Sequence, residues 1–402
     1  MRLLIAAYHL NVIGGTEKYL QALLPALARR GHELALVSER ALDPALERIN
    51  ASALSIPTHS LSEEGLDGVL QFAAAWNPDV VYLHGMARAD FEQALVDRFP
   101  TALFAHNYYG TCATGSKCFS FPQIRPCTRR FGRACLVLHY PRRCGGLNPL
   151  IAWRTYQFQL ERYHLLPRYF AVFVAGEHMR QEFLRHGVDP EKLHIAPLPL
   201  ANESGEQPDI ANRVPEGRIL FLGRITAIKG VRQLIQAAEK AAVKMDRPLT
   251  LTVAGEGPEV PRLRQMAKES LVAIEFAGWV HEAQKQELFA RTDILAAPSL
   301  WPEPFGLVGL EAGSRGIPAV AYANGGIPGW LIPGVSGELA PGDPPTVDGL
   351  ADALVRALAD PVHYQNLCRG AWNQARRFSM EAHLAALEPV LASAQKGSLM
   401  NR

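Results

Sequence analysis

Short, almost uninterrupted apolar runs alternate with helical patterns along this chain of 402 residues, and this alternation constrains its fold more than any other feature. A run that is apolar at nearly every position predicts a parallel strand covered on both faces. Parallel strands need crossover connections, which the intervening helical patterns supply. The predicted strands are residues 3–7, 33–38, 79–83, 101–105, 172–175, 218–223, 249–255, 274–278 and 294–297. The sequence therefore predicts an α/β protein built on doubly wound parallel sheets.

The length of the chain exceeds what one ordinary core supports and favours two domains of about 200 residues each. We expect a Rossmann-like N-terminal domain at 1–200 with a Cys- and Arg-rich insert at about 107–150. A polar linker bracketed by prolines is predicted at 201–215, a Rossmann-like C-terminal domain at 216–375, and a final helix at 376–402.

Composition excludes several classes of function. The formal net charge of +2 gives no bulk attraction for nucleic acid, so we expect no nucleic-acid partner. No apolar run approaches the length of a membrane span. The first residues carry one arginine and an apolar core too short for a signal peptide, so a cytoplasmic protein is expected.

The segment 298–326 carries the sharpest functional signal. Prolines at 298, 302 and 304 exclude a helix before Gly306, and residues 307–315 have the composition of one. Glu303 then precedes the N-terminus of that helix, and Glu311 lies about one turn inside it. Free N–H groups at a helix N-terminus bind anions, and flanking carboxylates accept hydrogen bonds from hydroxyls. A sugar, a diphosphate and a ribose, joined in that order, match this layout.

The motif from Glu303 to Glu311 resembles the E-x7-E signature of retaining glycosyltransferases of family 4, which have the GT-B fold with two Rossmann-like domains facing a cleft. The resemblance implies that Glu303 binds donor-sugar hydroxyls and that Glu311 binds the ribose. Backbone groups at Phe305, Gly306 and Leu307 are expected to face the phosphate or sugar. It also implies that the last helix crosses back to the first domain. The base is expected near Gly257 and Val280, each in a loop that follows a predicted strand.

Arg224 and Lys229 follow the first strand of the second half, next to Gly223. A nucleoside diphosphate leaves with developing negative charge, which either a divalent metal or Arg and Lys must stabilise. The chain contains no Asp-x-Asp pair of the kind that holds such a metal. Arg224 and Lys229 also match the R-x4-K pattern of the family. We therefore expect a UDP- or GDP-type donor and no catalytic divalent metal.

The first half contributes a glycine-rich turn and a histidine. Gly14 and Gly15 lie where the first strand passes to a helix, where glycine permits positive φ and close approach of a ligand. Their position resembles the first loop of the family, which faces the cleft. His106 follows another strand, and in the family a histidine at this point contacts the donor sugar.

The segment 112–144 is unusual in its cysteines. Five of the six cysteines of the chain lie there: Cys112, Cys118, Cys127, Cys135 and Cys144. A structural zinc or iron–sulfur site using four of them, reduced thiols and disulfides all remain open, because the spacing lacks a Cys-x2-Cys pair.

The same region is basic and carries no Asp or Glu between Arg98 and Gln159. It is either a solvated face or a site for an anionic acceptor or membrane surface, where Trp153, Tyr156 and Phe158 would meet the interface.

The sequence thus predicts a retaining, metal-independent hexosyltransferase that acts on a glycan, lipid-linked or small-molecule hydroxyl, in cell-surface polysaccharide synthesis. Peripheral contact with the inner face of the membrane is part of this expectation. A nucleotide-sugar epimerase or a phosphorylase of the same fold is one alternative. A non-catalytic protein that binds sugar nucleotides is the other.

Overall fold

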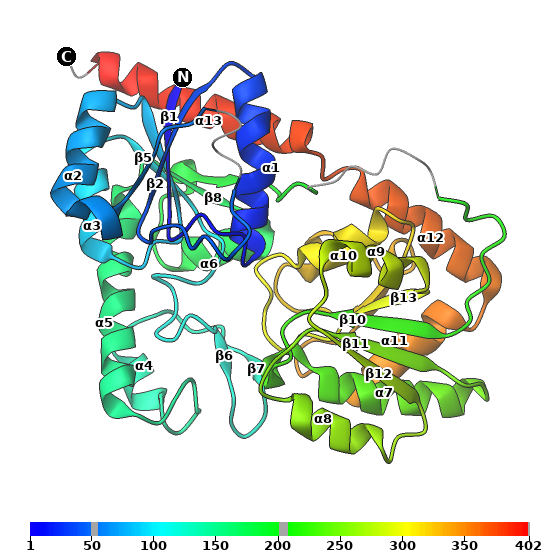
Figure 1. The fold of residues 1–402 in the computed structure, drawn as a ribbon. Coiled ribbons are helices and arrows are strands. Elements are labelled where there is room, and N and C mark those ends of the chain that lie inside the picture. The colour runs from blue at the N-terminus through cyan, green and yellow to red at the C-terminus, as the bar shows by residue number, and fades with distance from the viewer. Residues whose placement is uncertain (50–54, 201–207, 401–402) are drawn as a thin grey trace. The chain divides into compact units, whose positions relative to one another are not determined.

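The computed structural model describes residues 1–49, 55–200 and 208–400, with side chains up to residue 394. The described residues form two compact units (Figure 1). Unit 1 contains the described residues of 1–116, 129–201 and 380–402. Unit 2 contains the described residues of 117–128 and 202–379. The first part of the predicted linker, 201–207, lies outside the described residues, and the remainder belongs to unit 2.

Unit 1 contains a parallel sheet whose seven described strands run in the order β3-β2-β1-β4-β5-β8-β9. The strands are β1 (Arg2–Ala7), β2 (Glu33–Ser38), β3 (Thr58–Ser60), β4 (Val80–His84), β5 (Thr101–Phe104), β8 (Ala171–Val174) and β9 (Leu193–Ile195). The helices are α1 (Gly15–Arg29), α2 (Leu61–Trp76), α3 (Ala89–Arg98), α4 (Ala134–Leu138), α5 (Pro149–Leu165), α6 (Glu177–Arg185) and α13 (Met380–Met400). Short 3-10 turns lie at η2 (Leu166–Arg168) and η3 (Pro190–Lys192).

Alternate residues of the central strands face opposite layers of unit 1. Val81 and Leu83 pack with α2 and α3 on one face. Tyr82, between them, meets Tyr19 of α1 on the other face, with their hydroxyls 3.0 Å apart. Helix α13 completes this second layer, because His383 Nε2 lies 2.8 Å from the Tyr19 hydroxyl. Burial on both faces explains why these strands read as uninterrupted apolar runs.

Unit 2 contains a second parallel sheet, whose described strands run in the order β12-β11-β10-β13-β14-β15. The strands are β10 (Arg218–Leu222), β11 (Thr250–Ala254), β12 (Ala273–Gly278), β13 (Ile294–Ala297), β14 (Ala319–Tyr322) and β15 (Gly337–Ala340). The helices are α7 (Val231–Met245), α8 (Val260–Ala267), α9 (Glu282–Ala290), α10 (Leu307–Gly313), α11 (Val347–Leu358) and α12 (Pro361–Ala375), with turns η4 (Ala227–Lys229) and η5 (Ile327–Gly329). The prediction of two doubly wound parallel sheets is confirmed.

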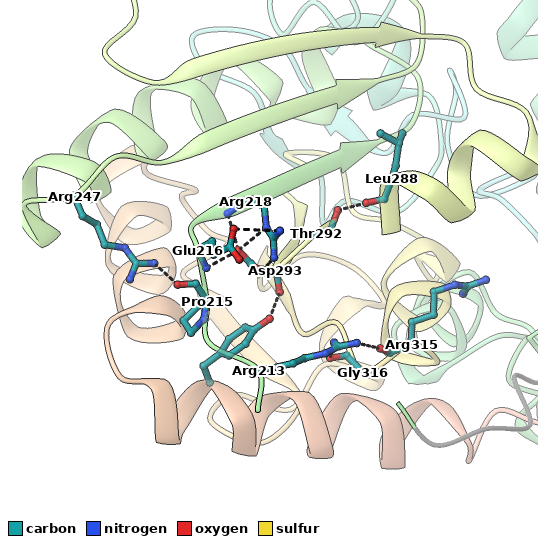
Figure 2. Close-up of polar contacts among 11 residues, drawn as sticks. Arg213, Pro215, Glu216, Arg218, Arg247, Leu288, Thr292, Asp293, Arg315 and Gly316 are labelled. Atoms are coloured by element: carbon teal, nitrogen blue, oxygen red, sulfur yellow. Dashed lines mark hydrogen bonds and ion pairs between the residues drawn. The ribbon is translucent and has the colours of Figure 1, made fainter. Parts of the chain in front are cut away.

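A polar network holds the amino end of this second sheet together (Figure 2). The buried Asp293 carboxylate accepts hydrogen bonds from the Arg218 guanidinium, at 2.9 and 3.3 Å, and from the backbone N–H groups of Glu216 and Arg218, at 2.9 Å each. The Tyr364 hydroxyl donates to the Asp293 carbonyl at 3.2 Å. These bonds tie the start of β10 to the start of β13.

Three details differ from the sequence-based expectation. The helix expected at 307–315 ends at Gly313. Part of the predicted insert, Lys117–Thr128, belongs to unit 2, where it forms the hairpin of β6 (Cys118–Phe119) and β7 (Arg125–Pro126) and packs Ile124 against the core. The Tyr156 side chain is buried in unit 1 rather than at an interface. No helix in the described part of the chain is long and apolar enough to cross a bilayer.

Candidate functional site

The order of the strands in unit 2 creates a switch point between β10 and β13. From β10 the chain moves outward through β11 and β12, and it then returns to the other side of β10 as β13. Ligands of open α/β sheets bind at such a point, beyond the carboxyl ends of the strands. The loops after β10 and β13 carry Lys229 and Glu303, so the predicted residues lie where the topology favours a ligand.

Lys229 and Glu303 form an ion pair across this switch point. The Lys229 Nζ lies 2.5 Å from Glu303 Oε1, which also accepts a hydrogen bond from the Ser299 hydroxyl at 2.6 Å. The Lys229 side chain is 20% exposed and that of Glu303 is 14% exposed. The ammonium also lies 5.0 Å from the centroid of the Trp301 ring. The cation predicted for the diphosphate and the carboxylate predicted for the sugar therefore neutralise each other in this structure.

Close packing between the two loops brings this pair together. The Leu300 N–H donates to the Ile228 carbonyl at 2.9 Å. Gly230 has φ of +73°, and a Cβ at this position would lie 1.9 Å from the Pro298 carbonyl oxygen. A larger residue at 230 would force the loops apart and separate Lys229 from Glu303.

The loop that carries Glu303 packs closely against glycines and a tryptophan. A Cβ at Gly325 would lie 2.2 Å from the Glu303 carbonyl oxygen, and the Gly326 N–H donates to that oxygen at 2.6 Å. Trp330 donates its indole N–H to the Phe305 carbonyl at 2.7 Å and fills the space that a Cβ on Gly309 would occupy. These contacts fix the path of the chain through Phe305, Gly306 and Leu307.

Arg224 projects from the loop after β10, and its side chain is exposed. This loop is bonded to the loop after β11, because the Ile225 N–H donates to the Glu256 carbonyl at 2.7 Å. A Cβ on Gly257 would lie 2.1 Å from the Ile225 carbonyl oxygen. Gly257 therefore serves the packing of one loop on the other, in addition to any contact with a ligand, whereas a Cβ on Gly223 would meet no atom closer than 3.6 Å.

Glu311 also has a lysine partner, which sequence reasoning missed. The Lys285 Nζ of α9 lies 3.1 Å from Glu311 Oε2 and 2.9 Å from Glu282 Oε2. The Glu311 side chain is 29% exposed. Val280 precedes the same helix α9, so the predicted base and ribose contacts come from neighbouring parts of unit 2. The local sequence around Lys285 carries no motif, and only the packing of α9 beside α10 brings it to Glu311.

In unit 1, Gly14 and Gly15 lie at the start of α1, after β1, next to the switch point between β1 and β4. Gly14 does not use the positive φ that glycine permits, because its φ is −137°, and its N–H donates to Glu17 Oε2 at 2.8 Å. A Cβ on Gly15 would meet no atom within 4 Å. The local fold therefore does not require glycine at position 15. Close approach of a ligand is a reason for glycine there.

His106 follows β5 and belongs to a cluster of histidines. Its Nε2 lies 3.0 Å from Nδ1 of His84, the last residue of β4. Burial lowers the pKa of His106 to about 3, with a smaller contribution from His383. Burial likewise lowers the pKa of His383 to about 4 and that of His84 well below its ordinary value. At neutral pH these imidazoles are uncharged, so His106 is suited to hydrogen bonding and not to charge stabilisation.

His106 also lines a pocket of unit 1 together with the buried residues Glu92 and Arg162. The Arg162 Nε lies 3.6 Å from Glu92 Oε2, and the Arg162 guanidinium donates to the Met86 carbonyl at 2.6 Å. The sequence carried no signal for this pair, because its members lie on two helices, 70 positions apart in the chain.

The predicted cysteine centre is not assembled. Among the described residues, which include all five of these cysteines, no group of three or more His, Cys, Asp or Glu side chains is arranged to hold a metal ion. Cys118 and Cys127 belong to unit 2, whereas Cys112, Cys135 and Cys144 belong to unit 1. Cys118 lies in β6 and Cys127 directly follows β7, so these two thiols belong to the hairpin that is part of unit 2. The prediction of a structural zinc or iron–sulfur site is therefore not supported.

Comparisons with known proteins agree with this arrangement. The family described as "Glycosyl transferases group 1" matches residues 206–377, and the "Glycosyl transferase 4-like domain" matches residues 14–199. Glycogen synthase of Mycobacterium tuberculosis is 26% identical over 423 residues, covering 96% of this chain and 95% of that protein. A D-inositol 3-phosphate glycosyltransferase of Streptomyces bingchenggensis is 30% identical over 241 residues, covering 55% of this chain and 52% of that protein.

Solved structures are similar over the whole chain. HepE of Anabaena, crystallised in complex with UDP and glucose, superimposes with a TM-score of 0.69 at 18% identity and covers 98% of this chain and 100% of its own. Sucrose-phosphate synthase of Thermosynechococcus elongatus superimposes with a TM-score of 0.72 at 20% identity and covers 99% of each chain.

Proposed function

The chain belongs to glycosyltransferase family 4, the glycosyl transferases group 1, with the GT-B fold, and from this premise we propose that it is a retaining hexosyltransferase independent of divalent metal. It transfers a sugar from a nucleoside-diphosphate donor to a hydroxyl of a glycan, lipid-linked or small-molecule acceptor in the synthesis of cell-surface polysaccharide. The observation that carries the proposal is the Lys229–Glu303 pair at the switch point of unit 2.

The ion pair suggests how the donor is received. A diphosphate carries more negative charge than one carboxylate, so it competes with Glu303 for the Lys229 ammonium. Arg224, on the same loop, supplies a second cation to the phosphates. Once Lys229 turns to the phosphate, Glu303 accepts hydrogen bonds from the sugar hydroxyls, and Glu311 accepts one from the ribose. Backbone groups at 305–307 contact the phosphate or sugar, and the base lies near Gly257 and Val280.

The proposed chemistry needs positive charge, positioning and no protein nucleophile. The bond from the anomeric carbon to the phosphate oxygen breaks, and a bond to the acceptor oxygen forms on the same face of the sugar. The acceptor proton passes to the leaving phosphate. Arg224 and Lys229 stabilise the charge that develops on that phosphate, and such preorganised groups supply much of the rate in enzymes.

Unit 1 supplies the remaining contacts in this proposal. A neutral His106 donates or accepts one hydrogen bond with a donor-sugar hydroxyl, consistent with its lowered pKa. Gly14 and Gly15 leave room for the sugar or the acceptor, since a Cβ on Gly15 would meet open space. UDP-type donors are the first to test, because HepE was crystallised with UDP-glucose, and GDP-type donors are the second.

The decisive experiment measures release of nucleoside diphosphate from UDP- and GDP-sugars with a panel of hydroxyl acceptors, in excess chelator. We expect turnover to persist in chelator and the product to keep the donor's anomeric configuration by NMR. Turnover lost in chelator and restored by Mg²⁺ or Mn²⁺ would contradict the proposed role of Arg224 and Lys229. Interconversion of sugar nucleotides without an acceptor would indicate an epimerase, and donor binding without release would indicate a sensor.

The proposed place of action is the cytoplasm at the inner face of the membrane, where a lipid-linked or anionic acceptor would be available. The arginine-rich residues 129–160 of unit 1, which include no Asp or Glu, support this part of the proposal.

A further inference from the structure

One end of unit 1 exposes large apolar side chains on α4, on the turn after it and on the first turns of α5. Figure 1 shows these two helices side by side. The exposed side chains, which we call the α4–α5 face, are Val137 (75% exposed), Tyr140 (44%), Leu147 (70%), Leu150 (68%), Ile151 (59%) and Trp153 (50%). Single exposed apolar residues are common on protein surfaces, whereas six within seventeen positions mark an interaction surface.

The face stands on an ordered frame. Cys135 and Leu136 of α4 pack with Tyr156 and Leu160 of α5 around the buried Phe131. The turn between the helices is closed by His139, whose Nε2 lies 2.9 Å from the Gly146 carbonyl oxygen. The inner sides of both helices are thus already used in the core of unit 1, and the exposed side chains have no place there.

The chain segment that forms the face carries charge of one sign. From residue 129 to residue 160 the chain has no Asp, Glu or Lys, and its arginines are Arg129, Arg130, Arg133, Arg142, Arg143 and Arg154. Arg133 and Arg143 are exposed between the apolar residues of α4 and the turn, and Arg154 is exposed on α5 one turn after Leu150. A surface that combines apolar side chains with arginines and no carboxylate complements a layer of apolar chains beneath anionic headgroups.

We propose that the α4–α5 face docks unit 1 on an anionic lipid surface, with Leu147, Leu150, Ile151 and Trp153 entering the headgroup region. The arginines bind the lipid phosphates. The inference extends the proposed function, because a lipid-linked acceptor is met at that surface. Its test needs no turnover, so failure of docking and failure of glycosyl transfer are separate results.

The test is sedimentation of the full chain with vesicles of phosphatidylcholine alone, or with about one-third phosphatidylglycerol. We expect binding to the anionic vesicles only, weakened by salt. Leu150→Ser with Ile151→Ser should lower the partition coefficient at least about tenfold. Arg133→Gln with Arg154→Gln should lower it about 25-fold, since each basic residue near such a surface contributes about 1 kcal/mol, or about fivefold.

Matched controls come from unit 2. Val243 and Leu271 are exposed to a similar degree, 67% and 77%, and their double replacement by serine should leave binding within about twofold. Arg232 and Arg262 are exposed as well, and their double replacement by glutamine is the charge control. Equal sedimentation with neutral and anionic vesicles, or an equal effect of the control variants, overturns the proposal. The chain could also self-associate in the absence of lipid. If the Leu150 and Ile151 changes abolish such self-association, the proposal is overturned, because the face then binds a second copy of the chain.

Discussion

The two ends of strands β10 and β13 each carry an ion pair, and the pairs are built differently. At the amino end, Asp293 accepts bonds from the Arg218 guanidinium and from two backbone N–H groups, and its side chain is 4% exposed. At the carboxyl end, the Glu303 carboxylate accepts only from the Lys229 ammonium and the Ser299 hydroxyl among the described contacts. The Asp293 pair is held by main-chain geometry, whereas a ligand can replace one partner of the Glu303 pair. The first is suited to stability and the second to binding.

The largest effect is expected from breaking the Lys229–Glu303 pair at the carboxyl end. Lys229→Ala should lower kcat about 100- to 1000-fold, because a preorganised cation facing the leaving phosphate is lost. The midpoint of thermal unfolding should change little. Lys240→Ala is the matched control, since Lys240 forms a surface pair with Asp348 at 2.5 Å in the same unit. Steady-state kinetics with the best donor gives kcat for both variants. A loss of kcat shared by the control would remove the distinction between the two ends.

The amino-end pair should respond in the opposite way. Asp293→Asn should lower the free energy of unfolding by about 2–3 kcal/mol, because the side chain loses its charge and one of its two acceptor oxygens becomes an NH2 group that faces buried donors. The affinity of the folded protein for the donor should stay the same. Asp348→Asn, which breaks the exposed pair with Lys240, should cost less than about 0.5 kcal/mol. Urea unfolding measures these differences, and equal costs for the two variants would refute the structural role of Asp293.

The carboxyl edge of unit 1 extends the comparison, because its clustered polar groups are neutral histidines. The pKa values of His106 and His383 are lowered to about 3 and about 4, below those of the unfolded chain. The stability they contribute is complete above about pH 6.5 and is lost as the pH falls toward the folded-state values. At about pH 5, each of these two histidines should lower the free energy of unfolding by about 2 kcal/mol. Urea unfolding at several pH values tests this, and a flat profile down to pH 5 would contradict it.

The smallest expected effect separates the two glutamates at the carboxyl end. Glu311→Ala should weaken binding of UDP alone by about tenfold, because a hydrogen bond between the carboxylate and the ribose is lost. Glu303→Ala should leave UDP affinity within about twofold or raise it, since Lys229 is released for the phosphates. Glu275→Ala, which removes a surface partner of Arg291, is the control. Calorimetry showing equal weakening by the Glu303 and Glu311 changes would refute the separate roles.

Local patterns were enough to predict most of the secondary structure. The strands predicted at 33–38 and 294–297 match β2 and β13 in both bounds. Such segments can be recognised in the sequence from continuous apolar runs and from glycines near their ends. The short edge strands β3, β9 and β15 were missed, because three or four residues at the edge of a sheet carry too little periodicity to predict.

The candidate site was predicted only as far as the loops that carry it. Arg224, Lys229, Glu303 and Glu311 follow from motifs, and each lies in unit 2 at or near the carboxyl edge of the sheet. The partners of these residues were not predictable, because Lys285 and Ser299 reach them through packing between segments distant in sequence. The histidine cluster was missed for the same reason, since His106 and His383 are almost 280 positions apart.

The sequence by itself determined the α/β alternation and the charged residues of the donor loops, because strand, turn and helix signals are local and survive without knowledge of distant neighbours. Only the tertiary structure decided what those residues touch. It paired Lys229 with Glu303, carried Cys118 and Cys127 into unit 2, buried Tyr156 and left Trp153 exposed. Burial and pairing depend on which segments meet in three dimensions, and a residue's own neighbours along the chain do not carry that information.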